Sequence, residues 1–362
     1  MSIPKKTEGL IGSVLLVLIF STVVCGCIAN DEVNNNPETR TITDMADRTI
    51  EIPVNPKNVL CPSPPSMVLV YMIAPDRLGA WNSPPGNMGD IQYIPEKYRN
   101  LPVAGGWMGT QSGNYETFIS LNPDLILDGY NSQEDFKSLI NERQNKFGTI
   151  PVVGMADDFD ASAYDIPISF VGYVLGEEKK AEELNTFYHR IYDRVCAGVK
   201  NIPDDKRVTV YYAESSSGLS TDPVGSRHSQ LIDICGGINV AQFPAKPGTG
   251  LSEVSIEQVI TWAPEIIITV DKGFYNSVYE NPLWKEIPAV KNNRVYLTPK
   301  TAFNWFDRPP GINRILGIAW CAKIMYPDEF SDVDLYALAK EFHRDYFHYE
   351  LTDTELDEIL KK

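Results

Sequence analysis

Two segments of the chain repeat one pattern of hydrophobic and polar positions. Residues 116–127 read ETFISLNPDLIL, and residues 257–268 read EQVITWAPEIII. Each predicts a short helix that ends before the proline, because the residue before a proline avoids the α region. The apolar run after each acidic residue is typical of a parallel strand that is covered on both faces. The repeat therefore indicates two halves of similar architecture.

The elements around this repeat follow the same order in both halves. Each half opens with a predicted strand, continues with a helix and closes with another strand. These elements are residues 57–61, 65–73 and 151–155 in the first half and residues 207–213, 229–237 and 294–298 in the second. Strands that alternate with helices predict an α/β fold of two lobes, each with a mainly parallel central sheet.

The segment between the halves, residues 164–203, predicts a single long helix that joins the lobes. Apolar side chains recur at near-helical spacing from Ile168 to about Val199, although Gly172 and Gly176 weaken the first turns. The N-terminal lobe is then residues 41–163 and the C-terminal lobe residues 204–362. One connecting helix leaves little room for a large hinge movement, so we expect a ligand cleft between the lobes.

The N-terminus predicts export and membrane attachment. Lys5 and Lys6 precede an apolar run at residues 10–24, which is short for a membrane span of ~20 residues and suits a secretory signal. The run ends at Val24-Cys25-Gly26-Cys27, which resembles a lipobox. We therefore predict a signal peptide at residues 1–26, lipidation of Cys27 and a flexible tether at residues 27–40. The alternative is an uncleaved helical anchor. Both place the rest of the chain at the extracytoplasmic face of the membrane.

Composition excludes some classes of function. The chain has 362 residues, 43% of them apolar, and a formal charge of −16 without a Lys/Arg-rich run, so nucleic-acid binding is not expected. The motifs GxSxG, HExxH and Walker A are absent, which argues against an enzyme. An extracellular hydrolase built from the Ser, His and Asp content is the alternative. Cysteines 61, 196, 235 and 321 form no CxxC pair, and the sequence does not show whether any two of them pair.

Several segments together resemble a known family. These are TITDMADRTIEIP (41–53), AGGWMGTQSGNYETFISLNPDLIL (104–127), SQLIDICGGINVA (229–241) and VSIEQVITWAPEIIIT (254–269). In order and spacing they resemble the solute-binding proteins of ABC importers whose two lobes are joined by one long helix. That family serves iron–siderophores, haem, cobalamin and, in some branches, molybdate or tungstate. The resemblance implies Rossmann-like lobes, a monomer, no resident cofactor, and an ABC permease with its ATPase as partners.

The resemblance also gives a role to one acidic residue in each repeat. Glu116 and Glu257 occupy equivalent positions, where the family docks onto basic residues of the permease. Two carboxylates on separate lobes suit a two-fold symmetric partner. The alternative is that each is an acidic residue in the first turn of a helix, where the helix dipole favours it.

The cleft is expected to be lined by loops at the carboxyl ends of the strands. The side chains predicted there are Ser66, Trp81, Trp107, Tyr130, Arg227, His228, Tyr275, Trp305 and Arg308. Two arginines at one cleft of an acidic protein favour an anionic ligand, because guanidinium groups bind oxyanions and carboxylates with two hydrogen bonds. Some of these residues have alternative roles. Ser66 would cap a helix, as Ser63 would, and His228 would cap the helix that follows it. Arg308 would fix its turn through a salt bridge to Asp307 or another acid.

Three functions remain open at this point. The favoured one is capture of an iron chelate, haem or corrinoid that stacks on Trp107, Trp305 and Tyr275. The alternative is a small oxyanion, molybdate or tungstate, for which the hydroxyl-rich loop SSSGLSTDPVGSRHS at residues 215–229 would supply donors. Such ligands would bring Fe, Co, Mo or W with them. A sensory or adhesion module without transport is the third. A receptor for bare divalent metal is not expected, because the other three histidines do not converge with His228.

Overall fold

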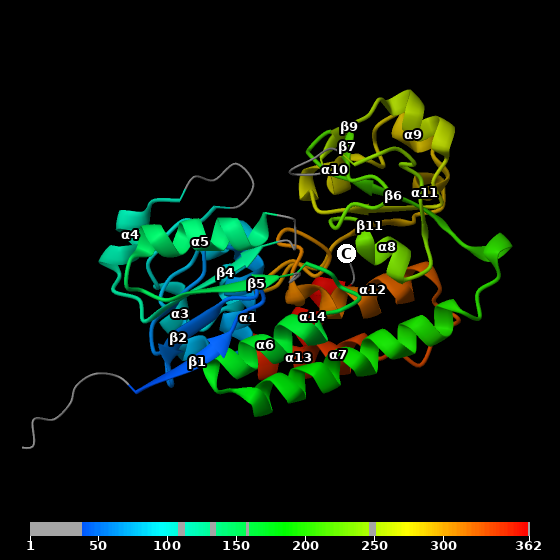
Figure 1. Ribbon diagram of the computed structural model, residues 1–362. Helices are drawn as coiled ribbons and strands as arrows, with labels where there is room; N and C mark the ends of the chain where they lie inside the picture. The colour runs from blue at the N-terminus through cyan, green and yellow to red at the C-terminus, as the bar shows by residue number, and fades with distance from the viewer. Residues whose placement is uncertain (1–37, 108–112, 131–134, 157–158, 246–250, 361–362) are drawn as a thin grey trace, which may run out of the picture. The chain divides into compact units, whose positions relative to one another are not determined.

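The repeated pattern forms an inner strand of each of two parallel sheets. The computed structural model describes residues 38–107, 113–130, 135–156, 159–245 and 251–360 (Figure 1). In the first lobe the strand order is β3 (Val59–Leu60), β4 (Leu125–Tyr130), β5 (Val152–Ala156). In the second it is β8 (Ile238–Asn239), β6 (Thr209–Ala213), β10 (Ile266–Thr269), β11 (Val295–Leu297). All neighbouring strands in both sheets are parallel, as predicted.

Equivalent hydrogen bonds confirm the repeat. The backbone N–H of Asp124 donates to the carbonyl of Asn58 at 2.8 Å, and that of Glu265 donates to Thr209 at 3.0 Å. The carboxylates of the same two acids accept from the chain at the start of the neighbouring strand, from Asn58 N–H at 2.9 Å and from Thr209 N–H at 2.8 Å. The acidic residue after each proline therefore ties the repeat strand to the opening strand of its lobe.

Helices cover the faces of both sheets. The first lobe contains α1 (Pro64–Ile73), α2 (Pro85–Met88), α3 (Glu96–Arg99), α4 (Tyr115–Ser120) and α5 (Phe136–Phe147). The second contains α8 (Gln230–Ile234), α9 (Ile256–Trp262), α10 (Lys272–Ser277) and α11 (Pro288–Lys291), with the short antiparallel pair β7 (Ser220–Thr221) and β9 (Ser252–Glu253). The 3-10 turns are η1 (Pro75–Arg77), η2 (Ile91–Tyr93), η3 (Asp204–Lys206), η4 (Trp284–Glu286) and η5 (Ile312–Arg314). The N-terminal segment forms an antiparallel hairpin of β1 (Thr39–Thr43) and β2 (Thr49–Pro53).

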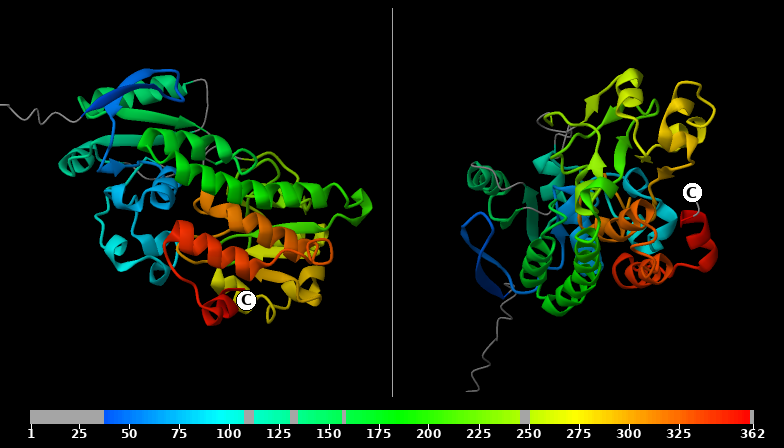
Figure 2. Two further views of the ribbon diagram at one scale, coloured as in Figure 1. Left: turned by 90° about the horizontal axis from the view of Figure 1, so that it is seen from below. Right: turned by 90° about the vertical axis from the view of Figure 1, so that its right-hand side faces the viewer.

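The long connecting helix is present but begins later than predicted. It is α7 (Glu178–Val199), and residues 165–175 form a separate helix, α6 (Asp165–Leu175). Gly176 separates them in the left-handed conformation, with φ of 67°, which a glycine adopts without strain. Figure 2 shows α6 and α7 side by side. In the described ranges no helix combines the length and apolarity needed to cross a bilayer. The predicted signal peptide, Cys27 and the predicted tether up to residue 37 lie outside the described residues, whereas Thr39 and Arg40, at the end of the predicted tether, belong to β1.

The C-terminal segment packs against both lobes, whereas the prediction assigned all of residues 204–362 to the second. It contains α12 (Ile315–Met325), α13 (Leu335–Phe342), the π-helix η6 (His343–Phe347) and α14 (Asp353–Leu360). Helix α12 packs on α7, and η6 packs on α1 of the first lobe. The hydroxyl of Tyr71 in α1 donates to the carbonyl of Phe347 at 2.9 Å. Every residue of α1 after Pro64 is consequently buried.

Candidate functional site

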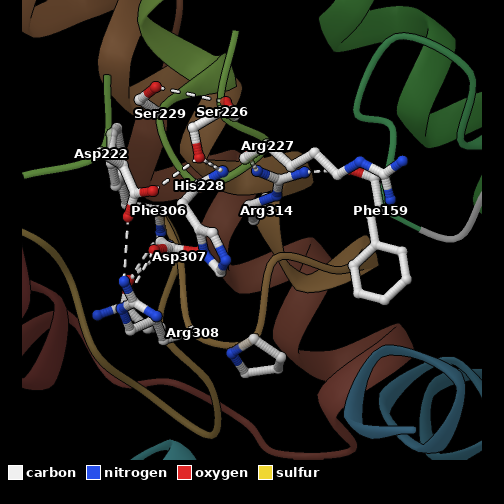
Figure 3. Close-up of polar contacts among 12 residues, drawn as sticks. Phe159, Asp222, Ser226, Arg227, His228, Ser229, Phe306, Asp307, Arg308 and Arg314 are labelled. Carbon is white, nitrogen blue, oxygen red and sulfur yellow. Dashed lines mark hydrogen bonds and ion pairs between the residues drawn. The ribbon is translucent and has the colours of Figure 1, made fainter. Parts of the chain in front are cut away.

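A cluster of charged side chains lies beyond the carboxyl ends of the second-lobe strands. Glu214 directly follows β6. Asp222 directly follows β7, and Asp307 and Arg308 lie on the loop after β11 (Figure 3). Glu214, Asp222 and Asp307 are at most 2% exposed. Because parallel strands end at one edge of the sheet, Glu214 and the loop after β11 meet there, and an antiparallel bridge between Glu214 and Ser220 brings Asp222 to the same edge. Sequence analysis did not single out Glu214 or Asp222, although an acid directly after a buried strand was the available signal.

Arg308 is bound by these carboxylates. Its Nε donates to Glu214 Oε1 at 2.7 Å and its Nη2 donates to Asp222 Oδ2 at 3.0 Å. Asp307 Oδ2 lies 3.5 Å from Nε, and the backbone of Arg308 is left-handed with φ of 53°. This is the alternative role that the sequence left open, a salt bridge that pins the turn. The side chain is 37% exposed, but its charge is already matched within the protein.

The carboxyl groups of the cluster have opposite pKa shifts. Burial, together with a hydrogen bond to Asp222, raises the pKa of Glu214 to about 9, so Glu214 is a neutral acid at pH 7. Burial alone would raise the pKa of Asp307, but His228 and Arg308 outweigh it and hold the pKa below its ordinary value. At neutral pH Asp307 therefore remains ionised beside His228 and Arg308.

Asp307 orients His228 toward the surface. Nδ1 of His228 lies 2.7 Å from Asp307 Oδ1, and the hydroxyl of Tyr212 donates to the other carboxylate oxygen at 3.1 Å. Because Asp307 is ionised, Nδ1 carries the hydrogen. Nε2 has no hydrogen-bond partner in the described part of the chain, and the side chain is 18% exposed. The imidazole therefore does not cap the following helix, which was its alternative role. When protonated, it presents an N–H group to the surface.

Arg227 differs from Arg308 in having no ion pair with any described residue. Its guanidinium carbon lies 5.5 Å from the centre of the Phe159 ring, which belongs to the chain leaving the first lobe (Figure 3). Such stacking fixes an arginine without neutralising it. Arg227 and His228 thus form an adjacent pair of side chains that can offer positive charge and N–H donors to an anion.

The loop that carries Arg227 is held by a fully buried arginine that sequence analysis missed. Arg314 donates from Nη1 to the carbonyl of Arg227 at 2.7 Å and from Nη2 to the carbonyl of Phe159 at 2.5 Å. Its Nε donates to the hydroxyl of Tyr164 at 2.8 Å. One guanidinium therefore fixes the second-lobe loop to the segment after β5. The only sequence signal was a basic residue immediately before an apolar helix.

Three of the predicted ligand residues lie in the core, which corrects those predictions. Trp81 and Trp305 are 0% exposed. The indole N–H of Trp81 donates to the carbonyl of Tyr98 at 2.8 Å, and that of Trp305 donates to Thr301 Oγ1 at 2.9 Å. Ser66 is also 0% exposed, on α1. Buried rings of this size stabilise the lobes, and none of the three side chains has a surface that a ligand can contact in this structure.

Trp107 and Tyr275 each pack within their own lobe. The Trp107 ring lies 4.0 Å from the guanidinium carbon of Arg143 and 4.5 Å from the Tyr115 ring centre. Tyr275 meets Tyr279 edge to face, with ring centres 6.5 Å apart. Both are partly exposed. The side chain of Tyr130 lies outside the described set. Of the nine predicted ligand residues, the structure brings Arg227, His228 and Arg308 together.

Asp222, His228 and Asp307 also offer ligand atoms within 4.8 Å of one another, a spacing that would suit a divalent cation. Arg308 competes for this position, because it donates to Asp222 and lies beside Asp307. Nδ1 of His228 is likewise bonded to Asp307. These ligand atoms are therefore already engaged by contacts within the protein. Arg227 and the Nε2 atom of His228 lie at the surface of the cluster.

Comparison with known proteins identifies the family. Residues 91–302, more than half of the chain, match the family model described as "Periplasmic binding protein". The chain belongs to this periplasmic binding protein family. A solved ABC transporter solute-binding protein from Sulfurospirillum deleyianum shares 31% identity and a TM-score of 0.83, covering 89% of this chain and 99% of the other. The family predicted from the sequence is confirmed. The chain is a solute-binding protein, and its relatives are substrate-binding components of ABC transporters rather than enzymes.

Two further relatives of this binding protein match along most of its length. The molybdate-binding protein MolA of Haemophilus influenzae is 24% identical over 329 residues, covering 85% of this chain and 91% of MolA. A substrate-binding lipoprotein of Bacillus subtilis, YvrC, is 24% identical over 335 residues, covering 91% of this chain and 100% of YvrC. The solved MolA structure has a TM-score of 0.69 at 22% identity and covers 86% of this chain and 99% of its own, which supports the shared fold.

In this binding protein, Glu116 and Glu257 occupy matching places on the two lobes. Glu116 lies in the first turn of α4 and Glu257 in the first turn of α9. Both side chains are exposed, and neither forms an ion pair with a described residue. Asn114 caps α4 and Ser255 caps α9 with a reciprocal capping box, so the helix ends do not depend on either glutamate for capping.

Proposed function

We propose that this protein is the receptor for a small tetrahedral oxyanion of the molybdate or tungstate type. The observation that carries the proposal is the Arg227–His228 pair: Arg227 forms no ion pair with a described residue, and Asp307 orients the imidazole beside it. A guanidinium offers an oxyanion a positive charge and several directed N–H donors. Arg314 fixes the loop beforehand, which reduces the entropy lost on binding.

The relatives support the same choice. MolA, which is named for binding molybdate, matches 85% of this chain. The vitamin B12-binding proteins of Vibrio cholerae match 55% of it, at 25% identity over 204 residues. The sequence had favoured a bulky chelate or corrinoid because several tryptophans were expected in the cleft. Trp305, one of the three aromatic residues expected to stack on such a ligand, is in the core instead, whereas Trp107 and Tyr275 are partly exposed, so the support for a stacked planar ligand is reduced.

Titration calorimetry tests the proposal. We expect molybdate and tungstate to bind with 1:1 stoichiometry, and sulfate and phosphate to bind more weakly because their oxygens are closer to the central atom. Cyanocobalamin, haemin and a ferric siderophore serve as competing ligands on the same protein. Absence of heat with both metal oxyanions, together with saturable binding of one of the three bulky ligands, would replace the oxyanion assignment with that ligand class.

A substitution tests the contribution of Arg227 to ligand binding independently of His228. Arg227→Gln removes the charge, so we expect the oxyanion dissociation constant to rise by about 10- to 100-fold, as for the loss of one charged hydrogen bond. Arg190→Gln is the matched control, because Arg190 lies on α7 and pairs with Glu341 at 2.7 Å. Equal affinity of the Arg227→Gln protein and the parent would remove Arg227 from the site.

Delivery of the ligand is proposed to depend on Glu116 and Glu257. Two exposed carboxylates at equivalent positions suit two basic sites on a symmetric permease. Reversing both charges should abolish transport while calorimetric ligand affinity stays unchanged.

Attachment through Cys27 is a further part of the proposal, supported by the lipoprotein name of the YvrC relative. Cys27→Ser should release the protein from the membrane fraction, and retention in that fraction would favour the uncleaved anchor.

A further inference from the structure

Each docking glutamate has an exposed isoleucine one helical turn after it. Ile119 on α4 is 40% exposed and Ile260 on α9 is 38% exposed. In the repeat, Glu116 aligns with Glu257 and Ile119 with Ile260. A single exposed isoleucine is common on protein surfaces and needs no explanation. An exposed isoleucine at the same position of the repeat on both lobes is a stronger observation, because a polar residue would fit an exposed position on either helix.

The two helices hold this pair in the same orientation. Residues three apart lie on one face of a helix, so each glutamate and its isoleucine are neighbours. The residue between them that faces the core is buried in both lobes, Phe118 in α4 and Val259 in α9, each 0% exposed. In both lobes a left-handed residue precedes the proline between the helix and the strand, Asn122 with φ of 48° and Ala263 with φ of 46°. The two connections from helix to strand are therefore alike.

Topology places the first turn of each helix at the carboxyl edge of the sheet in its own lobe. Each helix is joined to the following parallel strand by a short turn, so it runs back along the sheet and its first turn lies at the edge where the strands end. In the second lobe the candidate site, with Asp222 and Asp307, lies at this edge as well (Figure 3). A partner that spans the carboxyl edges of the two sheets contacts both pairs.

We infer that Glu116 with Ile119 and Glu257 with Ile260 form two matched docking patches for a permease surface that pairs a basic residue with an apolar pocket at each of two symmetry-related positions. This inference rests on the proposed docking role of the glutamates and adds the apolar half of each contact. Carboxylates attract and orient a basic partner and act mostly on the association rate. Burial of the isoleucines slows dissociation, and it is insensitive to salt.

The test is binding of the full-length protein to its cognate permease–ATPase complex in lipid nanodiscs. The Ile119→Ser/Ile260→Ser protein is expected to dissociate about tenfold faster or more, with the salt dependence of binding unchanged. Ile166→Ser is the matched control, because Ile166 is a helical isoleucine, 52% exposed, on α6 and outside the repeat. Ligand affinity and thermal stability of each variant establish that it is folded.

The outcomes separate this inference from the docking proposal itself. If the double isoleucine variant binds as the parent does while Glu116→Lys/Glu257→Lys does not bind, docking stands and the apolar half is wrong. If both double variants bind as the parent does, the docking proposal fails and the inference with it. Binding of the parent to protein-free vesicles that is lost in the isoleucine variant would show that the patches face lipid, which also overturns the inference.

Discussion

Arg227 and Arg308 have similar local sequence contexts, and their different contacts arise from residues distant in the chain. Both follow a strand of the second lobe, and both precede a helix. Arg308 meets Glu214 and Asp222, which come from positions 94 and 86 residues away. Arg227 meets the ring of Phe159 and no carboxylate among the described residues. The sequence places an arginine near a cleft. Whether its charge is neutralised depends on whether the neighbouring strand ends carry carboxylates.

Arg308→Gln should therefore reduce stability. It leaves Asp222 and Asp307 buried without their cation, which costs about 2 kcal/mol or more. The buried carboxyl groups then have raised pKa values in the folded state, so the loss relative to the parent should be larger at pH 8 than at pH 5. Urea unfolding at both pH values measures this, with Arg227→Gln as the comparison. An unchanged free energy of unfolding at pH 8 would contradict the role of Arg308 in pinning the turn.

Glu214 gives the cluster its own pH dependence. Its folded-state pKa of about 9 exceeds the ordinary value, so the folded protein holds a proton that the unfolded chain releases. That contribution to stability is complete below about pH 4.5 and is lost as the pH rises toward 9. Glu214→Gln keeps an uncharged hydrogen-bonding group and removes the titration. Its stability relative to the parent should rise with pH, by at most about 1.4 kcal/mol per pH unit.

Denaturant titrations from pH 5 to 9 measure this difference. Glu182→Gln is the control, since Glu182 is an exposed glutamate on α7. A constant difference between Glu214→Gln and the parent across this range would mean that Glu214 is ionised in the folded protein.

At the scale of elements, a glycine and a buried histidine fix where segments end and how they join. Gly176 divides the predicted connecting helix into α6 and α7. The periodicity of residues 168–199 continues across the break, because α6 and α7 each bury an apolar stripe. Hydrophobic spacing thus indicated helix on both sides of Gly176, and the left-handed turn at this residue reversed the chain direction.

His343 joins η6 to the loop after β11. It is fully buried, with Nδ1 2.7 Å from the carbonyl of Ala339 and Nε2 2.8 Å from Thr301 Oγ1. Burial lowers the pKa of His343 to about 3, so the folded protein keeps it neutral. Its contribution to stability is complete above about pH 6.5 and is lost as the pH falls toward 3.

His343→Gln tests this connection. The variant should be less stable than the parent at pH 7, by about 1 kcal/mol for an altered hydrogen bond, and the gap should narrow as the pH falls to 4. Thermal unfolding across this range is the measurement. His189→Gln on α7 serves as the control, because the His189 side chain is 45% exposed. A gap that widens toward acid pH would show that His343 is charged in the folded state.

At the scale of the whole molecule, the C-terminal segment couples the two lobes. The described residues belong to one compact unit. Phe347 and Phe303 pack together with ring centres 5.3 Å apart, and Phe303 packs on Tyr71 of α1 at 5.8 Å. The N–H of Asp90 in the first lobe donates to the carbonyl of Thr301 at 2.6 Å. The core of the first lobe is therefore completed by residues from the other end of the chain.

Phe347→Ala should loosen this coupling. Removing a fully buried phenylalanine costs about 3–5 kcal/mol. We expect unfolding of the first lobe to separate from that of the second, measured with probes in each lobe. Phe274→Ala removes a phenylalanine that is 2% exposed in a core cluster confined to the second lobe. It should lower stability without separating the lobes. A single coincident transition in the Phe347→Ala protein would contradict the coupling.

The sequence by itself determined the two lobes, their parallel sheets, the repeat, the family and the exposed glutamates. These depend on local periodicity and on residues close together in the chain, such as the Pro and acid before each repeat strand. Tertiary structure decided the site. Trp81 and Trp305 entered the core because α1 and the C-terminal segment cover them, and Arg308 was neutralised because three strand ends of the second lobe bring carboxylates to it. Such contacts join residues many positions apart in the chain, and a local sequence pattern does not predict which of these residues will be in contact.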